Sequence, residues 1–337
     1  KLNMQIKILF LKLLWSFIII IPLFYSLSAQ QRGQGRPPLR KHTINEKKEW
    51  RHVPATKNLR FESKTTFGLG RQQIKVEANG IPQHKVGQFP NRYNPHTIKE
   101  QAYEFVVQAN QKASRQITPL HNETGFGPPN TPFGIAINGV LFDPGTAEFY
   151  NGNRRSDWNY EALSGAVPLG VDENNAHVQP NGAYHYHGLP KGLLQKLDCN
   201  DKKHSPLIGY AMDGYPIYAI YGYKDPKDSK SSIKNLKSSY KLKEGRRPQT
   251  ARDPGGKYDG TFSKDYQYVK GSGDLDECNG RFTVTAEYPE GTYAYFLTED
   301  WPVIPRNFKA TPLKLRGGSP RFNGHRHRPP PRPRRFP

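Results

Sequence analysis

The sequence lacks the short motifs that mark several large enzyme classes. It contains no His-Glu-x-x-His, no Gly-x-Ser-x-Gly, no phosphate-binding Gly-Lys-Ser/Thr loop and no dinucleotide fingerprint. These absences argue against a zincin protease, an α/β-hydrolase, a kinase and a nucleotide-dependent dehydrogenase. They leave other enzymes open and do not decide whether the protein is an enzyme.

Long apolar runs are also scarce, because only residues 13–27 form one. Lys7 and Lys12 precede this run, and small or polar residues follow it at positions 28–31. This pattern predicts a signal peptide over residues 1–30 and a secreted, periplasmic or cell-surface protein. An uncleaved anchor is the alternative. There is no cysteine near the end of the apolar run, which argues against a lipoprotein. We expect no membrane span after signal cleavage.

Acidic residues are few, with 29 Asp and Glu against 50 Lys and Arg and a formal net charge of +21. Much of the excess lies in residues 31–60 and 316–337, which we predict to be a basic disordered arm and an Arg/Pro-rich disordered tail. Such segments attract acidic polysaccharide, anionic surfaces or other polyanions, with no specific nucleic acid implied. The alternative is a pair of solvating tails without a dedicated partner.

Cysteine occurs only twice, at Cys199 and Cys278. In the oxidising compartment of an exported protein, two thiols commonly pair, so we predict a disulfide bond. Such a bridge would stabilise the fold by roughly 4 kcal/mol in the chain-entropy model. The alternative is two free thiols that act as metal ligands, although they lack Cys-x-x-Cys spacing.

The middle of the chain, residues 61–315, has no internal repeat and no clear linker. Its frequent Pro and Gly argue against long helices. We therefore predict one mainly β domain, a large β-sandwich or barrel-like structure with long loops and few short helices. The expected elements are strands at 101–107 and 291–297, hairpins turning at Asn138-Gly139 and Asp213-Gly214, and helical turns near 158–163 and 191–197.

Residues 176–188 read Ala-His-Val-Gln-Pro-Asn-Gly-Ala-Tyr-His-Tyr-His-Gly. In a strand, alternate side chains share a face, so His185 and His187 point one way and Tyr184 and Tyr186 the other. The two histidines are then roughly 6.6 Å apart along the strand. Two flexible imidazoles at this separation can reach one metal ion.

The turn before this strand brings in a third histidine. Pro180-Asn181-Gly182 suits a three-residue hairpin loop closed by a glycine bulge. In that register His177 faces His185, and Asn175 faces His187. A two-residue loop would shift the register by one residue and move His177 away.

Three clustered imidazoles suit Zn, Cu or non-haem Fe and leave one coordination position open. We predict a divalent Cu or Zn ion on His177, His185 and His187, with His204 as a fourth ligand or a partner of a ligand. The alternative for His204 is a loop histidine that is hydrogen-bonded to backbone. Such an ion would activate water or, as Cu, change redox state beside a tyrosine. The alternative is a polar strand face with hydrogen-bonded histidines and core tyrosines.

The tetrapeptide Tyr184-His185-Tyr186-His187 names a known family, and the run from about residue 134 to 308 resembles its YHYH domain. The surrounding segments that also resemble the family are 138–140, 143–148, 158–163, 204–209, 213–214 and 273–280. The resemblance implies a bacterial-type exported protein. It implies no mechanism, so the metal hypothesis depends on the hairpin alone.

Other polar residues are weaker candidates. They are Asp213 at a turn, an oxygen-rich loop with Asp274, Asp276, Glu277 and Asn279, the carboxylates of Glu148 and Glu161, and a glycosylation sequon at 122–124. The main alternative function is a non-catalytic surface or matrix module that binds acidic polysaccharide through its basic arms and exposed aromatics. A hydrolase with paired carboxylates ranks below both, since no pair is identifiable.

Overall fold

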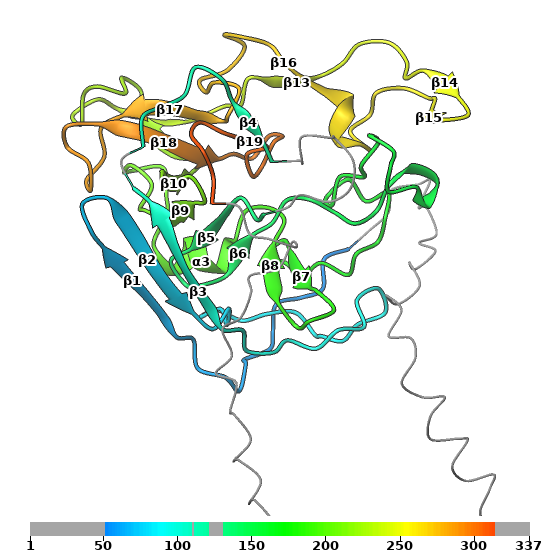
Figure 1. Cartoon of the computed structure of the whole chain (residues 1–337), viewed down its shortest axis with the longest axis horizontal. Helices are drawn as coiled ribbons and strands as arrows, with labels where there is room; N and C mark the ends of the chain where they lie inside the picture. The colour runs from blue at the N-terminus through cyan, green and yellow to red at the C-terminus, as the bar shows by residue number, and fades with distance from the viewer. Residues whose placement is uncertain (1–50, 110, 121–130, 314–337) are drawn as a thin grey trace, which may run out of the picture. The chain divides into compact units, whose positions relative to one another are not determined.

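The computed structural model describes residues 51–109, 111–120 and 131–313. The chain divides into two compact units, 1–41 and 42–337, and all described residues belong to the second. The predicted signal peptide, the arm up to residue 50, the tail and the sequon at 122–124 lie outside the described residues. Figure 1 shows the fold, which is mainly β as predicted.

A mixed eight-stranded sheet forms the centre of the described domain (Figure 1). Strands β10 and β18 are parallel, as are β6 and β8, and the other neighbours are antiparallel. The order has two ends, so within the described residues this sheet is open and not closed into a barrel. In spatial order the strands are β17 (Gly280–Thr283), β18 (Thr292–Leu297), β10 (Pro216–Ala219), β9 (Gly209–Ala211), β5 (Gly134–Ala136), β6 (Leu141–Phe142), β8 (Tyr184–Tyr186) and β7 (Ala176–Val178).

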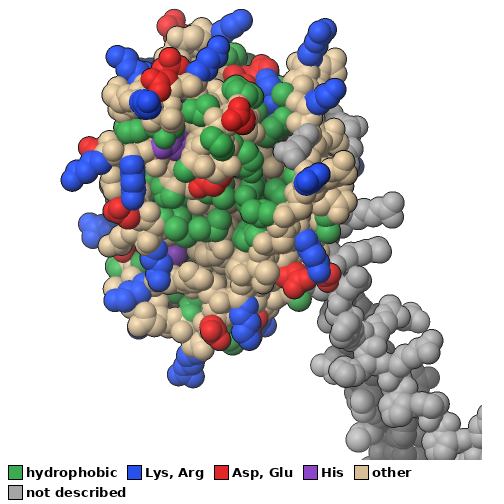
Figure 2. Space-filling view, turned by 90° about the vertical axis from the view of Figure 1, so that its left-hand side faces the viewer, with side chains coloured by type: hydrophobic (Ala, Val, Ile, Leu, Met, Phe, Trp, Pro, Cys, Tyr) green, Lys and Arg blue, Asp and Glu red, His purple; other side chains and the backbone are tan. Residues whose placement is uncertain are grey.

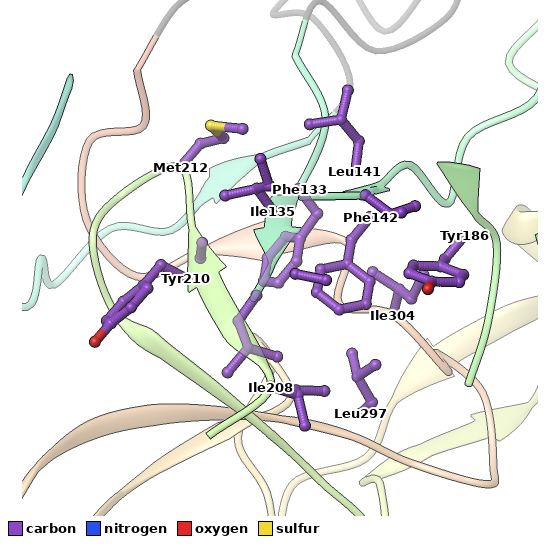
Figure 3. Packing of buried hydrophobic residues seen from close by; sticks show 14 of the residues in the cluster. Phe133, Ile135, Leu141, Phe142, Tyr186, Ile208, Tyr210, Met212, Leu297 and Ile304 are labelled. Carbon is purple, nitrogen blue, oxygen red and sulfur yellow. The ribbon is translucent and has the colours of Figure 1, made fainter. Parts of the chain in front are cut away.

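A three-stranded antiparallel sheet packs against this centre, built from β1 (Thr65–Leu69), β2 (Gln73–Ala78) and β3 (Tyr103–Gln108). Residues of β2 and β3 alternate between buried and exposed, which is the period of a half-buried strand. Their inward side chains join one hydrophobic cluster with those of the eight-stranded sheet. Figure 3 shows part of that cluster, where Ile135, Phe142 and Tyr186 come from three strands of the central sheet.

Smaller elements complete the fold. The two-stranded pairs are β11 (Tyr221–Tyr223) with β12 (Ile233–Asn235), β13 (Tyr240–Leu242) with β16 (Tyr266–Tyr268), β14 (Gln249–Thr250) with β15 (Asp253–Pro254), and β19 (Asn307–Phe308) with β4 (Thr118–Pro119). The described helices are α3 (Lys191–Lys196) and the 3-10 turns η1 (Tyr150–Gly152) and η2 (Ser263–Asp265). None of the described helices is long and apolar enough to cross a bilayer.

Local sequence signals located several elements correctly. The predicted hairpins at Asn138-Gly139 and Asp213-Gly214 are present, and both glycines have positive φ. Helix α3 occupies the predicted stretch near 191–197. Of the helical turn predicted near 158–163, only one hydrogen-bonded turn is present, in which Ser164 donates to Glu161. The backbone before it pairs with other segments, because Tyr160 donates to Glu148 and Glu161 donates to Thr261.

The first described residues already pair with the domain. Val53 donates its backbone N–H to Val171, and Lys57 exchanges two backbone hydrogen bonds with Val86. Residues 53–57, which belong to the predicted basic arm, are therefore part of the folded structure. Basic charge also covers the domain itself: on the face near β1 and β17, Lys and Arg side chains lie around a hydrophobic centre (Figure 2).

The predicted disulfide is not formed, since Cys199 and Cys278 are both free. Cys199 lies just after α3, where its Sγ contacts the Ala219 carbonyl at 3.7 Å, while Cys278 is fully buried in the hydrophobic cluster. Burial raises the pKa of both thiols. A disulfide requires Cα atoms within about 7 Å of each other and side chains directed toward each other. Neither the cellular compartment nor the number of cysteines determines this geometry, so the sequence could not establish the bond.

Candidate metal centre

The β7–β8 hairpin has the loop and the register that the sequence predicts. Gly182 donates to Gln179 across the turn at 2.8 Å and has a φ of 90°. Gln179 in turn donates to Ala183 at 2.9 Å, which closes the three-residue loop. Strand pairing then places His177 opposite His185. His187 donates its backbone N–H to Asn175 at 2.7 Å, so these two residues also face each other as predicted.

The three histidine rings converge on one face of this hairpin. The Nε2 atoms of His185 and His187 are 3.0 Å apart, and those of His187 and His177 are also 3.0 Å apart. Each pair of ring centroids is separated by 4.7 Å. This is the single group of three or more metal-ligating side chains found among the described residues.

Backbone carbonyls determine which ring nitrogens carry hydrogen. His177 Nδ1 lies 3.0 Å from the Leu169 carbonyl, and His185 Nδ1 lies 3.2 Å from the Ala183 carbonyl. Because a carbonyl oxygen only accepts, both Nδ1 atoms are donors, and both Nε2 atoms present lone pairs in the neutral rings. His187 Nδ1 is buried and forms no hydrogen bond of full geometry. The Pro144 carbonyl raises the pKa of this ring through a weaker contact.

The cluster is therefore not satisfied by its own hydrogens. His187 Nε2 lies between two lone-pair nitrogens, and a single hydrogen there bonds to only one of them. The other contact, also 3.0 Å long, then has no hydrogen between its two nitrogens, and if His187 carries its hydrogen on Nδ1 instead, both contacts bring lone pairs together. Nitrogens that bind one Zn²⁺ or Cu²⁺ at about 2.0–2.1 Å are about 2.9–3.4 Å apart, so the observed spacing fits a shared ion.

Burial keeps two of the rings neutral. His185 and His187 are 2% and 3% exposed, and His177 is half-buried. Loss of hydration lowers the pKa of His185 and His187 well below the usual value, and the neighbouring His177 lowers both further. Neutral imidazole is the form that binds metals, so both rings are ready as ligands near neutral pH.

The tyrosines of the tetrapeptide occupy the opposite face. Tyr184 and Tyr186 are fully buried in the core. The Tyr184 hydroxyl donates to Asp172 at 2.7 Å, and the Tyr186 hydroxyl accepts from Asn138 at 2.9 Å. Their alternation with the histidines is as predicted, and it directs both hydroxyls away from the cluster. The packing therefore gives no support to a tyrosine redox partner beside the ion.

His204 has different surroundings. Its Nδ1 donates to the Ser205 carbonyl at 2.8 Å, and its ring packs against Tyr218, Tyr223 and Phe296. The group of converging ligand atoms does not include it. These contacts correspond to a loop histidine held by backbone and aromatic rings, the alternative to its predicted role as a fourth ligand.

The remaining carboxylate candidates have structural partners. Asp213 Oδ2 accepts backbone N–H groups of Lys309 and Ala310, which fixes the segment after β19. Glu161 Oε2 pairs with Arg306 at 2.7 Å. In the oxygen-rich loop, Asp276 Oδ1 accepts from Cys278 and Gly280, Asp274 pairs with Lys234, and Asn279 donates to Phe296 and Thr298. For Glu277 and Glu148 the contacts are to the backbone carbonyl and not to the carboxylate: the first accepts from Tyr240 and the second from Asn159.

Sequence reasoning missed Asp143, which follows β6. The parallel β6–β8 pairing aligns Leu141 with His185, so the continued register places Asp143 beside His187. Its carboxylate accepts from Gln179 at 3.1 Å. Burial raises the pKa of Asp143 to about 6, although Gln179 and the charge of Arg306 lower it. No local signal identifies this residue, because the β6–β8 pairing joins distant parts of the chain.

The fold and the site together define a mainly β protein with a three-histidine cluster on one hairpin. The family model described as YHYH protein matches residues 113–310, more than half of the 337-residue chain. The chain therefore belongs to the YHYH protein family, as the tetrapeptide on β8 led us to expect. No curated protein and no solved structure matches the chain.

Proposed function

We propose that this protein is an exported metal-binding protein that holds one Zn or Cu ion through the Nε2 atoms of His177, His185 and His187. One observation carries the proposal. Three Nε2 atoms converge, two contacts measure 3.0 Å, and no arrangement of hydrogens on the neutral rings satisfies both contacts. A cation among the three nitrogens turns this repulsion into coordination.

The proposed site is of the kind that leaves a position for chemistry. Structural zinc sites are usually closed by four protein ligands, whereas catalytic sites use three and leave the fourth for water or substrate. The cluster offers three imidazoles, and the Asp143 carboxyl lies at the neighbouring register position. A Zn ion there would lower the pKa of bound water, and a Cu ion would add redox chemistry. The identity of the ion selects between these activities.

The test is elemental analysis of the full-length protein, purified without a His tag. We expect about one equivalent of Zn or Cu per chain, and much less in the His177→Ala/His185→Ala/His187→Ala variant. The variant keeps the other histidines of the chain, so they serve as an internal control. His204→Ala is the matched single control and should keep the full equivalent. Equal metal in parent and triple variant, or none in the folded parent after reloading, refutes the proposal.

Export is proposed from residues 1–30 alone. A basic start, an apolar run and a small-residue exit are the parts of a secretory signal. Expression with this segment in a bacterial host should deliver the protein outside the cytoplasm, with a mature terminus near Ala29 or Gln30 by mass spectrometry. A full-length product retained in the cytoplasm contradicts export, and a full-length membrane-bound product indicates an uncleaved anchor.

A further inference from the structure

A second concave site lies on the tyrosine side of the hairpin. It is a pocket of about 930 Å³, lined by residues 55, 58, 59 and 61–63, by residues 82–85 and 173–174, and by part of α3. This volume falls within the roughly 300–1,000 Å³ of small-molecule sites. Nothing in the proposed metal chemistry uses it.

One wall of the pocket is connected to the YHYH strand by hydrogen bonds. His84 lines the pocket, and its Nδ1 donates to the Lys85 carbonyl at 2.8 Å. Its Nε2 therefore accepts, and it lies 2.6 Å from the Tyr186 hydroxyl. Because Tyr186 and the histidine cluster occupy opposite faces of β8, the pocket and the cluster are separate sites, and His84 is the pocket residue that contacts the strand.

The charged groups of the pocket favour an anion. Lys85, Lys191 and Lys196 are exposed at its wall, and none forms an ion pair with another described residue. Of the two lining carboxylates, Glu173 accepts the backbone N–H of Ala55 at 2.9 Å. The lining therefore carries three ammonium groups against two carboxylates, a net charge of +1.

The other lining groups favour a sugar. Phe61 is 43% exposed, so its ring offers an apolar face next to the lysines. Gln83 and Gln195 are exposed amides that can both donate to and accept from hydroxyl groups. An aromatic ring for the C–H face of a sugar, amides for its hydroxyls and ammonium groups for its carboxylate are the parts needed to bind a uronic acid. The cations at the wall are all flexible lysines, not the bidentate arginines that suit phosphate.

We propose that this pocket binds an acidic oligosaccharide, with Lys191 and Lys196 contacting sugar carboxylates and Phe61 stacking on a sugar ring. The proposal places polysaccharide recognition in the folded domain and not in the basic arms. It does not depend on the metal centre.

The test is calorimetric titration of the full-length protein with a galacturonic acid tetramer at physiological salt. Lys191→Gln/Lys196→Gln should weaken binding about tenfold, as expected for two partly solvated charge pairs. Phe61→Ala should also weaken it. Lys227→Gln/Lys230→Gln removes the same charge from an exposed loop outside the pocket and should bind like the parent. The triple histidine variant should also bind like the parent.

Further ligands separate sugar recognition from plain charge attraction. The methyl-esterified tetramer keeps the sugar skeleton without its charge and should bind much more weakly. Polyglutamate carries the charge without the sugar and should be insensitive to Phe61→Ala. The proposal is overturned if the parent does not bind the tetramer, if the two lysine double variants weaken binding equally, or if inorganic phosphate competes as well as the tetramer.

Discussion

At the scale of single residues, hydrogen placement decides what the histidine cluster can do. The Leu169 and Ala183 carbonyls orient two rings so that their Nε2 lone pairs point into the cluster. A backbone carbonyl on Nδ1 is also the usual way in which proteins orient a metal-binding histidine. Burial lowers the pKa of His185 and His187, so these rings do not have to lose a proton before they bind an ion near neutral pH.

His187 should matter most among the three ligands, because its Nε2 takes part in both 3.0 Å contacts. Loss of a partner behind a ligand already costs about 10–100-fold in metal affinity, so His187→Ala should cost at least about 100-fold. Competition with a chromophoric chelator measures this affinity. A variant that binds within threefold of the parent would show that His187 is not a ligand.

The burial of His204 leads us to expect that acid lowers the stability of the protein even when no metal is bound. Burial lowers its pKa below the usual 6.5, so below that pH the unfolded chain takes up a proton that the folded chain does not. The free energy of unfolding therefore falls as pH decreases from 6.5. His204→Gln should flatten the profile between pH 6.5 and 5 by up to about 1.4 kcal/mol per pH unit. Urea unfolding of the metal-free proteins tests this, and identical slopes would contradict it.

At the scale of elements, the β7–β8 loop sets the register that assembles the site. Gly182 has a φ of 90°, and an added Cβ would lie 2.6 Å from the Lys99 side chain. Its carbonyl also accepts the Lys99 backbone N–H at 2.9 Å. A residue with a side chain therefore meets both backbone strain and a clash at this position.

Gly182→Ala should lower the free energy of unfolding by at least about 1–2 kcal/mol and weaken metal binding, because the shifted loop separates His177 from His185. Gly271→Ala is the matched control: its φ is 79°, and an added Cβ meets nothing within 4 Å. It should lose similar backbone stability and keep its metal affinity. Equal metal affinity in both variants would show that metal binding does not depend on the geometry of this loop.

The same elements show what the sequence alone could predict. The loops ending at Gly139, Gly182 and Gly214 are local, so turn residues and alternating strands locate them and even give the His177–His185 pairing. The parallel pairing of β6 with β8 joins segments that no local pattern connects. Asp143 was missed for that reason. The helical turn predicted near 158–163 is limited to one turn from Glu161 to Ser164 for a similar reason, because the backbone N–H groups of Tyr160 and Glu161 bond to distant residues.

At the scale of the whole molecule, the domain is held together without a covalent cross-link between its two cysteines. One hydrophobic cluster runs from the three-stranded sheet through the eight-stranded sheet and includes the buried Cys278. A chain of this size buries enough apolar surface to fold without a disulfide. The thiols therefore belong to the packing of the core and not to its covalent framework.

This arrangement predicts that a reductant leaves the thermal stability of the metal-free protein unchanged. A disulfide worth roughly 4 kcal/mol would, when reduced, lower the melting temperature of a domain this large by roughly 8–16 °C. Free thiols give no such shift, and alkylation after unfolding without reductant should label both cysteines. Metal-free protein is required because a bound ion would add its own stabilisation and a reductant would change the state of Cu. A drop of several degrees, or a chain that resists alkylation, would mean that the protein forms the bond after all and that the segment after α3 moves to reach Cys278.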